Sequence, residues 1–243
     1  MTTLQGRDTA HTVRSYEEEL NHLANVVMRM GGQAEAQLAS AVQAVLRRDS
    51  ELATRVVVAD ARIDEMEQEV HAFTVRLLAL RQPMADDLRA IVGALKISAD
   101  LERIGDYAAN VAKRALVLNQ LPPVPAVSGL PSMARMVQEI INDILDAYIE
   151  KDVEKALQVW RRDEEVDDLH TSLFREVITY MMEDPRNITA CTHLMFMAKN
   201  IERIGDHATN IAETIHFLVT GKALPLRRPK GKAETDLNPP VVD

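Results

Sequence analysis

Apolar residues recur every three or four positions along most of the chain. Leu101, Ile104 and Ala108, for example, fall on one side of a helix that faces a core. Prolines, glycines and polar breaks separate six such periodic segments. Each segment is predicted to form one long helix, and their ranges are 16–47, 49–80, 84–118, 131–149, 152–182 and 187–220.

An internal repeat is the strongest single signal in the sequence. The pentapeptide Glu-Arg-Ile-Gly-Asp occurs at residues 102–106 and again, letter for letter, at residues 202–206. The match continues to Asn110 and Asn210. Upstream, Asp49, Asp60 and Asp64 correspond to Asp152, Asp163 and Asp167. Repeated agreement of this kind indicates a duplicated unit of three helices.

The repeat and the breaks together predict the organisation of the whole chain. We expect an all-α fold of two tandem three-helix bundles, residues 16–120 and 131–220, joined by a proline-rich linker at 121–130. Residues 1–15 are expected to form an N-terminal extension. Residues 221–243 lack periodicity, so we expect a disordered tail there.

Composition narrows the class of protein. Aromatic residues make up only 4% of the chain, which suits helices better than a sandwich or barrel. The formal net charge of -9 argues against nucleic acid as a partner, because phosphate contacts need a basic surface. Residues 1–20 lack the apolar stretch that a signal peptide requires, and no later apolar run approaches the roughly 20 residues of a membrane span. We therefore expect a cytoplasmic protein that reaches a membrane only through a partner.

Acidic residues are spaced so that they line up along helix faces. Glu102, Asp106 and Asn110 recur every four residues and form a stripe roughly opposite the apolar face of their helix. The preceding helix carries a second stripe. This second stripe consists of Asp60, Asp64 and Glu67, and Asp163, Asp167 and His170 hold the matching places in the second repeat. Glu202 and Asp206 are the second-repeat counterparts of Glu102 and Asp106. We expect these acids to lie on the surface.

Two interpretations of these stripes stay open. Like charges four residues apart destabilise a helix by about 0.2–0.5 kcal/mol per pair, so their presence in both repeats suggests that a cation offsets them. Carboxylates with one histidine form an oxygen-rich set that suits Mg, Mn, Ca or iron rather than structural zinc. The alternative is a solvated acidic face that Arg103, Arg203 and other nearby basic residues partly neutralise.

Catalytic signatures are not found in the sequence. It has no nucleophile elbow, phosphate loop, dinucleotide fingerprint or His-Glu-x-x-His motif. A helical di-iron oxidase is the enzyme alternative, but its ligands project into the bundle, whereas these acids are expected to point away from the apolar face. We predict that the protein is not an enzyme.

Several of these motifs together resemble the PhoU family. The resemblance rests on the segments at 80–83 and 87–89 and on the doubled pentapeptide, and it runs from about residue 16 to residue 221. It implies two similar three-helix bundles, each with a surface acidic motif that holds metal ions in some members. The metal-binding positions implied by the resemblance are Asp60, Asp64, Glu102 and Asp106 in the first half and Asp163, Asp167, Glu202 and Asp206 in the second. Spacing alone adds Glu67 and His170, with Mg, Mn or Fe as the candidate metals.

The resemblance also implies a function. By this resemblance, the protein is expected to be a negative regulator of the phosphate-starvation response that also modulates phosphate uptake. Such a protein acts as a cytoplasmic adaptor between the ATPase subunit of the phosphate ABC transporter and a phosphate-sensing histidine kinase. The family resemblance also leads us to expect a homodimer.

Overall fold

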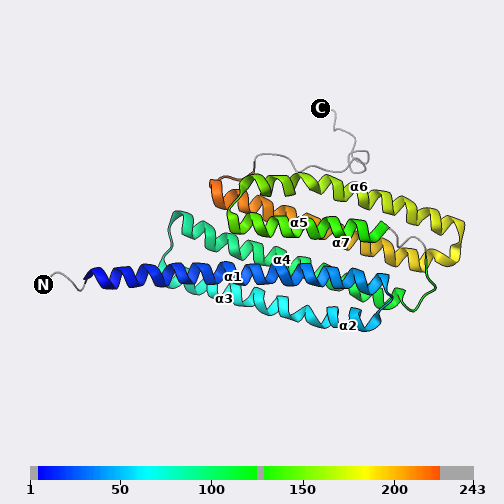
Figure 1. The fold of residues 1–243 in the computed structure, drawn as a ribbon, viewed down its shortest axis with the longest axis horizontal. Helices are drawn as coiled ribbons and strands as arrows, with labels where there is room; N and C mark the ends of the chain where they lie inside the picture. The colour runs from blue at the N-terminus through cyan, green and yellow to red at the C-terminus, as the bar shows by residue number, and fades with distance from the viewer. Residues whose placement is uncertain (1–4, 125–128, 225–243) are drawn as a thin grey trace, which may run out of the picture.

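The computed structural model describes residues 5–124 and 129–224, and this part of the chain consists of helices joined by short turns, without a β-strand. The elements run parallel or antiparallel along one long axis (Figure 1). In chain order they are α1 (Gln5–Leu46), α2 (Ser50–Ala59), α3 (Ala61–Arg81), α4 (Ala85–Leu118), α5 (Leu130–Glu150), α6 (Val153–Glu183), the 3-10 turn η2 (Pro185–Asn187) and α7 (Ile188–Thr220).

The predicted fold class is confirmed, with two differences in helix limits. The segment predicted at 49–80 is divided at Asp60 into α2 and α3, although Asp60 itself keeps helical dihedral angles. The first helix begins at Gln5 rather than near Tyr16. Residues 125–128 of the predicted linker and residues 225–243 of the predicted tail lie outside the described part of the chain.

Corresponding aspartates begin the second helical segment of each half. Asp49 accepts a hydrogen bond from the backbone N–H of Leu52 at 2.8 Å, and Asp152 accepts one from that of Lys155 at 3.1 Å. Both side chains therefore satisfy a helix N-terminal amide that has no partner within the helix. The role of this repeated pair is structural.

The two halves share one continuous core. In the first half α1, α2, α3 and α4 pack together, and in the second half α5, α6 and α7 do so. α4 also packs along α7, and α1 packs against α5 (Figure 1). Buried apolar side chains from both halves form a single cluster, which includes Ile104 and the corresponding Ile204. The helix that carries the pentapeptide in one half thus lies against its counterpart in the other.

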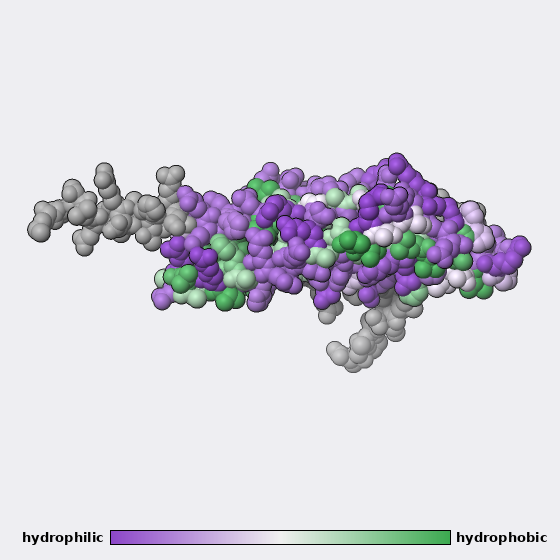
Figure 2. Space-filling view, turned by 90° about the horizontal axis from the view of Figure 1, so that it is seen from below, coloured by the Kyte–Doolittle hydropathy of each residue, from purple (hydrophilic) through white to green (hydrophobic). Residues whose placement is uncertain are grey.

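One face of the molecule is predominantly polar. The face in Figure 2 is mostly hydrophilic, with separate small hydrophobic areas. Within the described ranges, no helix combines the length and the apolar character that crossing a bilayer requires.

Candidate functional site

The first acidic cluster consists of Asp60, Asp64, Glu67, Glu102 and Asp106. Asp60 stands at the junction of α2 and α3, where its Oδ1 accepts a hydrogen bond of 2.9 Å from Nε2 of Gln37 on α1. The same Gln37 nitrogen lies 3.4 Å from the carbonyl oxygen of Gly105 on α4. One buried amide therefore fixes the position of Asp60 relative to the pentapeptide helix.

Gly105 allows α3 and α4 to approach closely. A Cβ atom at this position would lie 2.7 Å from Cδ1 of buried Ile63 and 3.4 Å from Oδ1 of Asp60. The absence of a side chain at this position therefore permits the close helix contact. The contact also places Asp60 beside the acids of α4.

Glu102 and Asp106 share one basic neighbour. The guanidinium of Arg103 lies 3.3 Å from Glu102 and 3.0 Å from Asp106, and 57% of the Arg103 side chain is exposed. Burial raises the pKa of Glu102, and the nearby charges of Asp106, Asp64 and Glu67 raise it further, against the opposing effect of Arg103. Partial neutralisation by arginine is therefore present in this half, while the carboxylates still repel one another.

Asp60 experiences the same repulsion. Burial raises its pKa most, the hydrogen bond from Gln37 opposes this, and the charges of Asp106 and Asp64 raise it again. The acids of α2, α3 and α4 thus lie within electrostatic reach of one another. A positive charge placed among them would stabilise their ionised forms.

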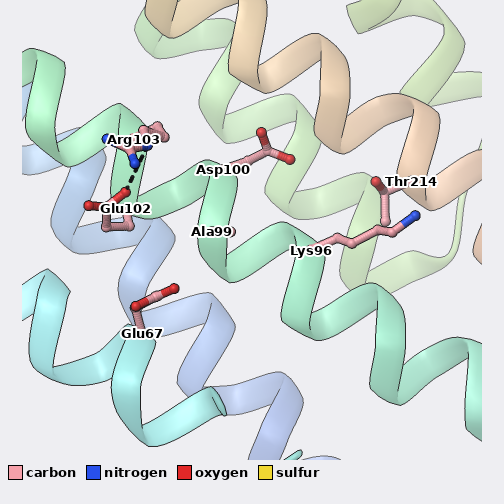
Figure 3. Close-up of a pocket in the computed structure, with 7 residues that line it drawn as sticks. All are labelled: Glu67, Lys96, Ala99, Asp100, Glu102, Arg103 and Thr214. Carbon is pink, nitrogen blue, oxygen red and sulfur yellow. Dashed lines mark ion pairs between the residues drawn. The ribbon is translucent and has the colours of Figure 1, made fainter.

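A pocket of about 470 Å³ lies beside this cluster. Figure 3 shows Glu67 on α3 facing Glu102 of α4, with the ion pair between Glu102 and Arg103 above it. Lys96 and Asp100 of α4 and Thr214 of α7 complete the lining on the other side. The acidic cluster therefore opens onto a solvent-filled recess.

The second acidic cluster consists of Asp163, Asp167, His170, Glu202 and Asp206. Here the expectation of surface acids is wrong for Asp163 and Glu202, which are only 4% and 7% exposed. Glu202 is covered because α7 packs against α4, α5 and α6 together, so a face opposite its own apolar stripe is still buried. Asp163 lies on α6, which packs against both α5 and α7.

Glu202 is paired with a lysine from its own helix. Nζ of Lys199 lies 2.7 Å from both carboxylate oxygens, and 43% of the Lys199 side chain is exposed. Burial raises the pKa of Glu202, Lys199 opposes this, and the charges of Asp206 and Asp167 raise it. The second cluster therefore has the same internal repulsion as the first.

Asp163 is held by a different donor from that used for Asp60. The hydroxyl of Thr209 lies 3.2 Å from Oδ1 of Asp163 and 3.0 Å from the carbonyl oxygen of Gly205. Gln37 of α1 has the corresponding position in the first half. The two halves thus keep the acid and the glycine but differ in the side chain that bridges them.

His170 is half-buried beside the second cluster. Burial lowers its pKa, and the positive charge of Lys199 lowers it further. The imidazole is consequently neutral near pH 7, which is the form that ligates metals. The first half has Glu67 at this place, so the two clusters differ in one potential donor.

The donor chemistry of both clusters fits a hard cation, although the side chains are not arranged around one. Within the described residues, no three His, Cys, Asp or Glu side chains stand together as a ready-formed metal site. Arg103 and Lys199 hold the places next to the carboxylates. Both basic side chains are exposed enough to move aside. A cation bound in their place would reduce the electrostatic repulsion between the carboxylates.

Two Glu-x-x-His sequences bear on the di-iron alternative, one at residues 19–22 and one at residues 213–216. They do not converge. Glu19 forms an ion pair with Arg81 at 2.7 Å, and His22 lies 3.4 Å from Glu69, both on α3. Glu213 instead accepts a hydrogen bond from Trp160 on α6. The two motifs face different bundles, so they do not form an inward-facing di-iron set.

Asp100 contributes a contact between the two halves that the repeat did not reveal. Its Oδ1 lies 2.8 Å from Nδ1 of His207 and 3.3 Å from Nδ2 of Asn210. The His207 ring also stacks at 5.6 Å on Tyr107, which is the corresponding residue of the first repeat. Asp100 is replaced by Asn200 in the second repeat, so repeat matching gave no signal for it.

Comparison with known proteins gives a consistent result. The family model for the PhoU domain matches the chain twice, at residues 27–115 and 130–215. The chain is 55% identical over 223 residues to the "Phosphate-specific transport system accessory protein PhoU homolog" of Caulobacter vibrioides, which covers 91% of this chain and 97% of that protein. A Serratia marcescens protein described as "Phosphate-specific transport system accessory protein PhoU" is 37% identical, covering 87% of each chain.

Solved structures agree with the sequence matches. The crystal structure of PhoU from Pseudomonas aeruginosa superposes with a TM-score of 0.81 at 40% identity, covering 85% of this chain and 100% of that chain. The phosphate transport system regulatory protein PhoU from Streptococcus pneumoniae superposes with a TM-score of 0.80 at 29% identity, covering 87% and 100%.

Proposed function

Because the chain belongs to the PhoU family, we propose that it is a negative regulator of the phosphate-starvation response that also modulates phosphate uptake. The observation that carries the proposal is the PhoU-domain match to both halves, together with close identity along nearly the full length of relatives described as phosphate transport accessory proteins. These matches support a role in the regulation of phosphate transport. Beyond what these matches support, we propose that the regulation is negative.

The proposed partners are the ATPase subunit of a phosphate ABC transporter and a phosphate-sensing histidine kinase. A cytoplasmic adaptor that binds as a homodimer would meet both at the inner face of the membrane. Long helices that pack on a continuous core give such an adaptor a rigid surface. The net charge of -9 favours basic partner surfaces and disfavours nucleic acid.

We assign the metal-binding part of the proposal to the two acidic clusters. Mg, Mn or Fe would be held by carboxylates of the first cluster, and by carboxylates and His170 of the second. The bound ion would supply positive charge among acids that otherwise repel one another. The support is the raised pKa of Asp60, Glu102 and Glu202, each with a neighbouring carboxylate among its causes.

The proposal involves no catalysis. The clusters lie on rigid helices, and a regulator needs only that binding alters its surface charge and shape. Replacing acids of the first cluster should therefore change regulation or metal content without affecting the turnover of any substrate.

A phosphate-starvation reporter tests this function. Cells that lack the gene, grown with ample phosphate, should show high reporter activity, and the wild-type gene should restore repression. A gene carrying Glu102→Ala and Asp106→Ala should restore less repression, or its purified product should bind less metal. The matched control replaces Glu51 and Glu183, exposed acids outside both clusters, and should behave as wild type. Low reporter activity in the deletion strain would contradict the proposed negative regulation.

A further inference from the structure

A basic groove lies between α4 and α7 on this acidic protein. Its volume is about 530 Å³, and its cationic residues are Lys113, Arg114, Lys199 and Arg203. His193, Phe196 and two asparagines, Asn110 and Asn200, also line it. None of the described residues that line the groove is an aspartate or a glutamate. This concentration of positive charge is unexpected on a chain whose net charge is -9.

Only one of the four cations in this groove is held in an ion pair among the described residues. Lys199 is paired with Glu202. For the other three cations, the described residues provide no ion pair with a carboxylate. Lys113 lies 3.4 Å from the amide oxygen of Asn110, and Arg203 lies over the ring of Tyr107 at 5.6 Å. Lys113 also lies close enough to Asp60 for its positive charge to lower the pKa of that carboxyl. The guanidinium groups of Arg114 and Arg203 are therefore the cations of the groove that are most available to an external anion.

Arg114 is held in position by its neighbours. Its guanidinium lies 4.0 Å from the centroid of the Phe196 ring, and its Nη1 lies 3.4 Å from Nδ1 of His193. Because a guanidinium only donates, Nδ1 accepts, and the neutral ring carries its hydrogen on Nε2. Burial and then the charge of Arg114 lower the pKa of His193. The stacked arginine thus loses little conformational freedom on binding an anion.

The duplicated chain provides an internal comparison. Positions 100 residues apart correspond in the two repeats, so the pocket beside Glu102 is the counterpart of the basic groove at the other end of the α4–α7 contact. The residues Ala99, Asp100 and Thr214 of that pocket correspond to Lys199, Asn200 and Arg114 of the groove. At each of these three places the groove is more positive or less negative, whereas at a fourth place Lys96 of the pocket corresponds to Phe196 of the groove. The pocket contains both acids and cations, while the groove contains cations without acids, so the groove is the more positive of the two recesses.

We propose that the basic groove binds a phosphate group, carried by inorganic phosphate or by a small phosphorylated molecule. Several cations and two amides around one recess suit a multiply charged oxyanion, and the fork of an arginine matches its oxygens. The volume is typical of a small-molecule site. The proposed binding does not depend on the proposed regulatory role, because binding is measured on the purified protein and regulation is measured in cells.

Calorimetric titration of the full-length protein with inorganic phosphate, and separately with ATP in the absence of metal, tests the proposal at constant ionic strength. We expect saturable binding of at least one of the two. Binding of ATP alone would identify the phosphorylated molecule as the source, and binding of inorganic phosphate would identify the free ion. The imidazole NMR signals of His193 should shift on binding, while those of exposed His71 on α3 should not.

Matched variants make the test specific to the groove. The double variant Lys113→Gln with Arg114→Gln should weaken binding about tenfold or more. The variant Arg76→Gln with Arg161→Gln removes the same charge from exposed positions on α3 and α6 and should bind as wild type. If the groove double variant does not fold by circular dichroism, Lys113→Gln alone replaces it. Absence of saturable binding, or equal weakening in the control, would overturn the proposal.

Discussion

Two glycines of one repeated motif have different surroundings. A Cβ atom added at Gly105 would come within 2.7 Å of Ile63, whereas at Gly205 the nearest atom, of Val166, would lie at 3.5 Å, an ordinary contact distance. The sequence of the pentapeptide is the same at both positions. It had no means of distinguishing them, because the difference depends on the isoleucine or valine that a neighbouring helix presents.

Alanine substitution should separate these two glycines. Gly205→Ala is expected to stabilise the protein by up to about 1 kcal/mol, because alanine is the better helix former and its methyl group has room. Gly105→Ala gains the same propensity but crowds Ile63, and overpacking costs about 1–3 kcal/mol. Urea unfolding of both variants checks the order. Equal changes in the free energy of unfolding would show that the close contact has no energetic consequence.

The raised pKa of Glu102 makes a second prediction, about pH. A carboxyl with a raised folded-state pKa binds its proton more tightly in the folded than in the unfolded protein, so its contribution to stability is full below the unfolded value near 4.5 and is lost as pH rises through the folded pKa. Glu102→Gln removes this loss. Without added metal, the variant should be more stable than wild type near pH 7 and equal to it at low pH.

Thermal unfolding across pH, in the presence of a chelator, measures this difference. Glu65→Gln, at an exposed position of α3, is the control and should show little pH-dependent change. A stability advantage of Glu102→Gln that is greatest at low pH would contradict the assignment of electrostatic repulsion to this cluster.

At the scale of elements, hydrophobic spacing and breaks located the helices of the fold, and four of the six segments were predicted to within about one residue at each end. The division at Asp60 was not predicted, because the residue keeps helical dihedral angles and neither a proline nor a glycine marks the position. The hydrogen bond that Asp60 accepts from Gln37, 23 positions earlier, likewise leaves no periodic trace in the sequence. The early start of α1 was not predicted, because residues 5–15 are mostly polar and carry no apolar periodicity.

The helix caps give a prediction at this scale. Asp49→Ala and Asp152→Ala each remove the side-chain acceptor of a first-turn amide, so each should lower the free energy of unfolding by about 1 kcal/mol. Chemical denaturation of the single variants measures the losses. Because the two caps lie in different halves, the double variant should show their sum. Glu165→Ala, within α6, should change little, and a comparable loss there would argue against capping.

At the scale of the whole molecule, the burial of the second cluster shows where sequence reasoning ends. Spacing along one helix defines its faces relative to that helix alone. It does not show which face a neighbouring bundle will cover, and α7 is covered on several sides. Asp163 and Glu202 were therefore identified as paired acids but placed wrongly on the surface.

The continuous core predicts that the two halves unfold together. Leu77 of α3 is buried, and α3 packs on helices of the first half. Leu77→Ala should destabilise the protein by about 2–5 kcal/mol. The only tryptophan, Trp160, lies in the second half, so its fluorescence reports on that half. In the Leu77→Ala variant, the unfolding midpoint measured by tryptophan fluorescence should fall by the same amount as the midpoint measured by circular dichroism. An unchanged fluorescence midpoint would show independent bundles.

Lys199 belongs to two of the sites described above. Its ammonium group neutralises Glu202 in the second acidic cluster and also lines the basic groove. If the proposed anion draws the lysine toward the groove, Glu202 is left with less compensation, and the affinity of the acidic cluster for the proposed cation would increase. Thermodynamic reciprocity then requires that the cation increase the affinity for the anion by the same factor. A single side chain would thereby make the protein respond to the coincidence of two solutes.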